Sequence, residues 1–173
     1  KEEHVIKTVE NRVPEAVTFH KTYDQFLFHP DDIPFDSYTH IPQVFTVFRK
    51  KCEKHCPVRP CFEKPVPKPT ENRIESTTEI PTLETLGFSN FETDHRSAFP
   101  FEGGEDNSLK RMQQYFWGTK RLAYYKKTRN GLVGTDYSSK FSAWLANGSI
   151  SARTIYWEVK RFENEIKKNQ DTY

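Results

Sequence analysis

The stretch between residues 57 and 81 carries six of the eleven prolines of this 173-residue chain. They are Pro57, Pro60, Pro65, Pro67, Pro69 and Pro81. Proline has no backbone N–H and a fixed φ, so neither a helix nor a central strand can continue through such a stretch. We therefore expect an extended connection, partly of polyproline type, that passes over a surface and joins two domains.

The residues before this connection predict a helix and then a short strand. Apolar residues in 1–13 recur at helical spacing, and Pro14 is expected to end that helix. The run 16–19 is β-branched and aromatic, as in a strand. A helix and one unpaired strand are typical of the end of an α/β unit, so we expect a missing N-terminal domain and interpret the chain, which starts at Lys1, as a piece of a longer protein.

A second helix is predicted to begin at Pro42, because proline is favoured at the first helical position. Its apolar face carries Val44, Phe45, Phe48 and Cys52. Its basic face carries Arg49, Lys50, Lys51 and Lys54. A solvated face is the simpler interpretation of these cations, and a nucleic-acid contact is the alternative.

The three cysteines, Cys52, Cys56 and Cys61, lie close together with His55 beside them. Their spacing matches neither the paired spacing of zinc sites nor an even-numbered disulfide framework. We interpret them as free thiols and assign no metal.

The remainder of the chain is predicted to be helical. We expect helices that begin after Gly103-Gly104 and over 121–129, 138–146 and 151–168. In the last of these, Ser151 is a candidate N-cap. Its apolar face is formed by Ile155, Val159, Phe162 and Ile166.

The predicted start of the third helix combines hydroxyl groups with a cation. Ser138, Ser139, Lys140 and Ser142 would stand beside unpaired backbone N–H groups, and such a helix start suits an anionic phosphate. On spacing alone, ordinary helix capping by the serines is the favoured interpretation of the pattern.

The amino-acid sequences of several segments resemble those of the cryptochrome/DNA photolyase family, particularly its DASH branch. The segments, in chain order, are DDIPF, QVFTVFRKKCEKHCPVRP, FPFEGGEDNSLKRMQQYFWGTKRLAYYKKTRNGL and YSSKFSAWLANGSISARTIYWEVKRFE. The similarity is collinear and spans nearly the whole chain. It departs at Ala143, where the family often has proline, and at Asn147–Ser149, which replaces a more apolar sequence.

The resemblance implies a mainly α fold, the start of the family's helical FAD-binding domain. It implies a remnant of the Rossmann-like α/β antenna domain over 1–36 and an interdomain linker with one helix over 37–100. The helical FAD-binding domain would begin at 101 and continue to 173. The remaining flavin contacts and the electron-transfer tryptophans would lie outside this chain, so Trp117, Trp144 and Trp157 are interpreted as packing residues.

Position by position, the family's cofactor-binding residues fall on six residues of this chain. They are Tyr125, Ser138, Ser139, Lys140, Phe141 and Ser142. Hydroxyls and amides would hold the diphosphate, and Lys140 would balance its charge. Phe141 would point into the core. Arg129 is a candidate DNA contact, although a cation that caps the helix dipole explains it equally well.

The resemblance further implies an FAD-dependent, blue-light-driven lyase that repairs cyclobutane pyrimidine dimers in single-stranded DNA. A methenyltetrahydrofolate antenna would occupy the missing domain, and the protein would be a cytoplasmic monomer without membrane contact. A blue-light photoreceptor without repair activity is the alternative. A third hypothesis is a colourless nucleic-acid-binding module, which would need local basic patches because the net charge is only +2. The chain by itself is expected to bind FAD weakly and to be inactive.

Overall fold

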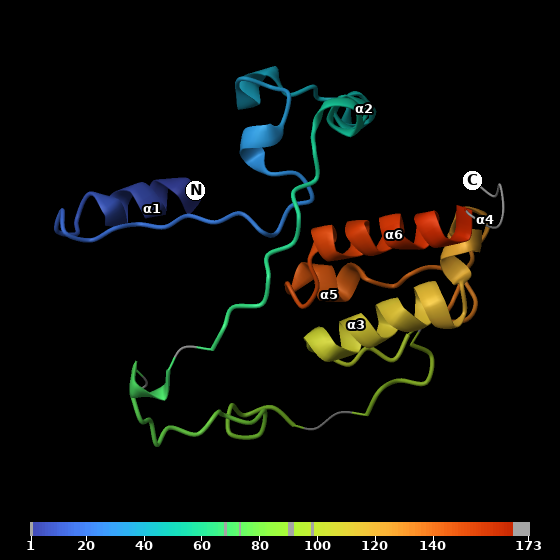
Figure 1. The fold of residues 1–173 in the computed structure, drawn as a ribbon. Helices are drawn as coiled ribbons and strands as arrows, with labels where there is room; N and C mark the ends of the chain where they lie inside the picture. Colours follow the sequence, from blue (N-terminus) through green and yellow to red (C-terminus); the bar gives the residue numbers. More distant parts are fainter. Residues whose placement is uncertain (1, 68, 73, 90–91, 98, 168–173) are drawn as a thin grey trace. The chain divides into compact units, whose positions relative to one another are not determined.

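The computed structural model describes residues 2–67, 69–72, 74–89, 92–97 and 99–167 (Figure 1). The chain divides into two compact units, Lys1–Pro57 and Val58–Tyr173. Within the described residues the regular structure is entirely helical, without a strand. This confirms the predicted mainly α fold.

The described residues of the first unit contain two α-helices and two short 3-10 turns. The helix α1 spans Glu2–Glu10, η1 spans Pro30–Asp32, η2 spans Tyr38–His40 and α2 spans Phe45–His55. The strand predicted over 16–19 is wrong, because these residues form a turn followed by irregular chain. A β-branched run becomes a strand only when a neighbouring strand accepts its backbone hydrogen bonds, and the described chain offers none.

The helix α2 begins three residues later than predicted. Val44, at φ −85° and ψ 111°, is still extended and serves as the N-cap, so Pro42 lies outside the helix. Cys52 is buried, and Phe48 stacks on Phe35 with ring centroids 5.7 Å apart. The basic residues of α2 are exposed, as expected for a solvated face. Phe45 is also exposed, so only part of the predicted apolar face is covered.

The cysteines are free thiols. Burial, followed by the neighbouring Cys52 thiol, raises the pKa of Cys56 to about 11, so this thiol stays protonated at neutral pH. Among the described residues no group of three potential ligands is placed to hold a metal ion. None of the helices in the described part of the chain has the length and apolar content needed to cross a bilayer.

The described residues within 58–104 are mostly without regular structure, apart from the 3-10 turn η3 at Thr70–Asn72. This agrees with the effect of the prolines, each of which removes a backbone donor. The role of this segment as an interdomain connection stays a prediction.

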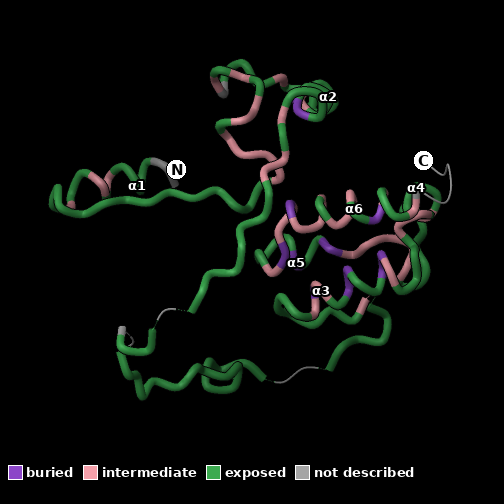
Figure 2. Tube along the Cα trace, in the orientation of Figure 1, coloured by how far each residue is buried: buried purple, intermediate pink, exposed green. Residues whose placement is uncertain are grey.

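The second unit is organised around helices drawn from residues 105–167. They are α3 at Glu105–Gln113, the π-helical turn η4 at Gln114–Gly118, the 3-10 turn η5 at Arg121–Tyr124, α4 at Tyr125–Thr128, α5 at Ser142–Ala146 and α6 at Ala152–Lys167. The end of the predicted fourth helix, Lys168, lies outside the described residues. Figure 2 shows the buried residues of this unit gathered on α3, α5, α6 and the chain between them.

An aromatic core holds these helices together. Its buried members are Met112, Tyr115, Phe116, Phe141, Trp144, Ile150 and Phe162. Partly buried residues of α6, Ile155, Val159 and Ile166, pack against it, which confirms the predicted apolar face of that helix. Trp144 and Trp117 belong to the packing, whereas Trp157 is 42% exposed and its indole N–H donates to the Arg59 carbonyl at 3.0 Å.

The start of α6 is capped as predicted. The Thr154 amide donates to Ser151 Oγ at 3.0 Å, and the two hydroxyls lie 2.9 Å apart. We expect Ser151→Ala to lower the free energy of unfolding by about 1 kcal/mol, since one helix N–H loses its acceptor. Chemical denaturation measures this loss. Ser151→Asp is the matched control and should retain the stability, because its carboxylate also caps the helix. Equal losses in both variants would contradict the capping role.

Candidate functional site

The segment that carries most of the predicted site residues is not a helix start. The helix α5 begins at Ser142, and Ser138, Ser139 and Lys140 precede it in irregular chain. The prediction of a helix over 138–146 is therefore wrong in its first four residues. The reason is the backbone of Lys140, whose φ of 65° is left-handed and incompatible with a continuing right-handed helix.

The backbone of this segment nevertheless has a form that suits an anion. Left-handed Lys140 is followed by Phe141 in the right-handed helical region, at φ −77° and ψ −9°. Successive residues of opposite hand bring their N–H groups to one side of the chain, in the concave arrangement known as a nest. The amides of this nest take the place of the helix N-terminus that the sequence predicted.

Arg111 fixes the position of the segment. Its guanidinium, from α3, donates to the carbonyl oxygens of Ser138 at 3.2 Å, Ser139 at 3.2 Å and Thr135 at 2.9 Å. It also forms an ion pair with Asp136 at 2.8 Å. The Arg111 side chain is 3% exposed, and its guanidinium lies over the Phe99 and Tyr115 rings, at 4.8 and 4.9 Å from their centroids. A buried guanidinium that donates to this many acceptors holds the loop in one conformation.

An apolar cavity lies beside the segment. It has a volume of about 180 Å³. Its walls are Phe116, Leu122, Tyr125, Ser139, Phe141, Ile155 and Val159. Three of the six predicted cofactor residues, Tyr125, Ser139 and Phe141, thus converge on one space from two separate stretches of chain. Tyr125 is the first residue of α4 and is 37% exposed.

Phe141, besides lining the cavity, is buried and stands edge-on to Phe116, at 5.9 Å between centroids, as predicted for a residue that points into the core. Two of the predicted serines occupy different positions. Ser138 is half-buried, and Ser142 is exposed at the first position of α5. Neither of these serines lines the cavity.

Lys140 turns back toward Tyr137. Its ammonium lies 3.6 Å from the centroid of the Tyr137 ring and contacts the Tyr137 hydroxyl. The cation therefore stays within the segment, held by a ring face that attracts positive charge. Its role in balancing a diphosphate stays a prediction.

Arg129 is exposed at the C-terminal end of α4, next to exposed Lys126 and Lys127. Cations at this end of a helix are favoured by the dipole, and they are equally able to meet phosphates of a nucleic acid. In contrast, Lys160 and Arg161 on α6 form ion pairs with Glu163 and Glu158.

The sequence analysis missed Arg111, Asp136 and Tyr137. A signal for Arg111 is present, since Ser108, Arg111 and Tyr115 follow the spacing of one helix face and all three are buried. A single arginine on a buried face needs acceptors from elsewhere in the chain. The identity of those acceptors is not encoded locally, because they lie 24 to 28 positions further along.

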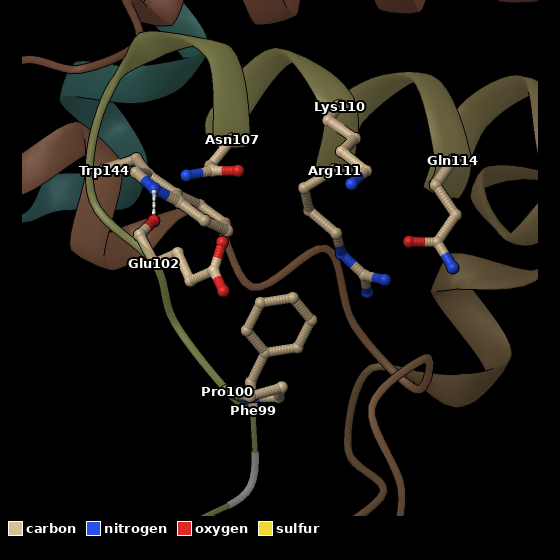
Figure 3. Close-up of a pocket in the computed structure, with 8 residues that line it drawn as sticks. All are labelled: Phe99, Pro100, Glu102, Asn107, Lys110, Arg111, Gln114 and Trp144. Atoms are coloured by element: carbon tan, nitrogen blue, oxygen red, sulfur yellow. Dashed lines mark hydrogen bonds between the residues drawn. The ribbon is translucent and has the colours of Figure 1, made fainter. Parts of the chain in front are cut away.

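A second hollow of about 160 Å³ lies along α3 (Figure 3). Figure 3 shows Arg111 and Lys110 projecting from the helix, and the Trp144 indole N–H donating to the Glu102 carbonyl at 2.9 Å. The residues that line this second hollow are Phe99, Pro100, Glu102, Asn107, Lys110, Arg111, Gln114 and Trp144. None of the predicted cofactor residues lines it, so the cavity beside Tyr125 is the candidate site.

No protein-family model matches the chain. The individual proteins that it resembles, in contrast, agree with one another. Cryptochrome DASH of Danio rerio is 42% identical over 96% of this chain, and cryptochrome DASH of a Synechocystis strain is 49% identical over 85%. The chloroplastic/mitochondrial cryptochrome DASH of Arabidopsis thaliana is 40% identical over 94%. The chain spans about a third of the length of these relatives, 33%, 30% and 28%.

The solved structure of a Synechocystis sp. PCC6803 cryptochrome matches with a TM-score of 0.72 at 48% identity, over 87% of this chain and 30% of that one. The helical fold and this match define the class, which is the cryptochrome/photolyase family. Within that class the chain belongs to the DASH-type cryptochromes, as the relatives in animals, plants and cyanobacteria agree.

Proposed function

We propose that the protein containing this chain binds FAD non-covalently and that the cavity beside Tyr125 forms part of its cofactor site. The observation that carries the proposal is the convergence of Tyr125, Ser139 and Phe141 on one apolar space. A volume of about 180 Å³ is below the ordinary range of complete ligand pockets, so this cavity would take one portion of a large cofactor, and its apolar walls suit flat aromatic rings. The residues present therefore fit part of an FAD.

The diphosphate would lie against the segment 138–142. The nest at Lys140 and Phe141 offers backbone N–H groups, the serines offer hydroxyls, and Lys140 offers a positive charge. Each of these groups stabilises an anion without a change in its own charge. The apolar cavity and this polar segment meet at Ser139, which belongs to both.

We further propose light-driven repair of cyclobutane pyrimidine dimers, a carbon–carbon lyase reaction, in single-stranded DNA. A bound FAD supplies photochemical electron transfer to the dimer. The residues of this chain would bind and orient the cofactor and exclude water from it. A damaged base is the least costly to unstack, and Arg129, Lys126 and Lys127 would meet the DNA phosphates beside it.

The test is a repair assay with the protein expressed from its complete gene. An oligonucleotide that carries a single thymine dimer is illuminated with blue light, and dimer loss is followed by chromatography. Dimer loss that requires both light and bound flavin supports the lyase. A flavin-loaded protein that leaves the dimer intact excludes it.

The second candidate is a blue-light photoreceptor without repair activity. The names of the relatives, which are cryptochromes, favour it. The same flavin residues serve both functions, so the repair assay separates them. Under either function we propose a cytoplasmic monomer, with a methenyltetrahydrofolate antenna bound outside this chain.

The Tyr125 ring provides a direct test of the cavity. Tyr125→Ala is expected to weaken FAD binding about tenfold, because about 1.5 kcal/mol of apolar contact is lost. Tyr125→Phe keeps the ring and should stay close to wild type. The neighbouring Tyr124, which is 54% exposed and outside the cavity, provides the control Tyr124→Ala. Flavin fluorescence titration measures all three variants, and equal affinities for Tyr125→Ala and Tyr124→Ala would contradict the assignment.

A further inference from the structure

We infer that Arg111 is a positioning residue for the cofactor diphosphate, acting through the backbone of Ser138 and Ser139. The inference rests on the proposed flavin site. According to this inference, a buried side chain of α3 orients the backbone N–H groups that would donate to the phosphate oxygens.

The first step is the direction of two peptide groups. In a trans peptide the carbonyl oxygen and the following N–H point to opposite sides. The described residues contain no cis peptide bond. The Arg111 guanidinium can only donate hydrogen bonds, and it donates to the Ser138 and Ser139 carbonyls at 3.2 Å each. The N–H groups of Ser139 and Lys140 therefore face away from the guanidinium.

The second step is the conformation that follows. With the Ser139 carbonyl held, Lys140 adopts its left-handed φ of 65°, which is uncommon for a residue with a side chain. Phe141 then returns to the right-handed region, and its ring is buried in the core. The nest is thus clamped at both ends, by Arg111 on one side and by the Phe141 ring on the other.

The third step is charge. The Arg111 guanidinium is paired with Asp136 at 2.8 Å, and only 3% of the side chain is exposed. The Asp136 side chain is 30% exposed, the pair is close to neutral as a unit, and the rings of Phe99 and Tyr115 cover the guanidinium. Arg111 therefore acts on a phosphate by orienting the amides, and its charge reaches the anion only weakly.

Arg111→Lys separates orientation from charge. Lysine keeps the charge but loses the planar fork, so it cannot reach the same set of carbonyl oxygens. In the protein expressed from its complete gene we expect FAD affinity to fall at least about tenfold. Affinity for riboflavin, which has no phosphate, should change by no more than about twofold.

Ser108→Ala is the matched control. Ser108 is buried on the same helix, and its hydroxyl donates to the Ser149 carbonyl at 3.2 Å, in a loop outside the phosphate segment. It should leave the ratio of FAD to riboflavin affinity unchanged. If Arg111→Lys weakens both ligands equally, or neither, the positioning role is overturned.

Wild-type protein supplies a second measurement that needs no variant. Hydrogen exchange of the Ser139 and Lys140 amides should be slower with FAD bound than with riboflavin bound. Equal exchange in the two states would overturn the inference while leaving flavin binding intact. A wild-type protein that binds no FAD would instead overturn the proposed function, and the inference would fall with it.

Discussion

Replacement of Ser139 and Lys140 together by alanine is expected to release FAD from the protein that contains this chain. The double variant removes a hydroxyl at the cavity wall and the positive charge of the nest. A hydrogen bond to a charged group contributes about 1.5–3 kcal/mol, so the dissociation constant should rise at least about tenfold. The preparation should lose its yellow colour during purification.

The matched control is Lys110→Ala. Lys110 is exposed on α3 in the same unit, so its loss changes the net charge equally without touching the segment 138–142. It should keep the wild-type flavin content. Absorbance of the purified proteins, normalised to protein concentration, gives the comparison. Equal flavin content in the double variant and in Lys110→Ala would contradict the diphosphate assignment.

Periodicity predicted the helices that pack on the core. In α6 the side chains of Ile155, Val159 and Phe162 recur at helical spacing, and all three face the aromatic cluster. The Ser151 cap was equally predictable, since a side-chain acceptor one residue before a helix is a local feature.

The start of α5 was not predictable, because it depends on a distant contact. The left-handed conformation of Lys140 ends any helix that arrives from Ser138, and lysine as a residue type gives no sign of it. That conformation accompanies the bonds from Arg111, which lies 28 positions earlier than Ser139. The residues of the candidate site could therefore be named from the sequence, but the backbone conformation that forms the nest depends on tertiary contacts.

The strand predicted over 16–19 failed for a related reason. Its residue types suit a pleated sheet, but a strand is stable only with a partner. The π-helical turn η4 was also missed. There the Thr119 amide donates to the Gln114 carbonyl at 2.8 Å, an i+5 bond that has no residue signature. This turn brings the neighbouring Tyr115 and Phe116 into the core, and Phe116 also forms a wall of the cavity.

The core residue Phe162 is expected to have the largest effect on stability. It is 0% exposed, and its ring meets the rings of Trp117 and Phe116 at centroid distances of 5.2 and 6.2 Å. Phe162→Ala should lower the free energy of unfolding by about 3–5 kcal/mol, since it removes a buried ring and leaves a cavity between α6 and η4. Phe162→Leu, which fills most of that space, should lose much less.

Phe62→Ala is the control for this substitution. Phe62 is 75% exposed in the proline-rich stretch, so the same chemical change there should alter stability by no more than about 0.5 kcal/mol. Because Phe116 lines the cavity and packs on Phe162, Phe162→Ala should also weaken flavin binding at the proposed cofactor site. Denaturant unfolding, followed by flavin fluorescence and by circular dichroism, tests both effects. A Phe162→Ala protein as stable as Phe62→Ala would show that α6 does not hold the cavity wall.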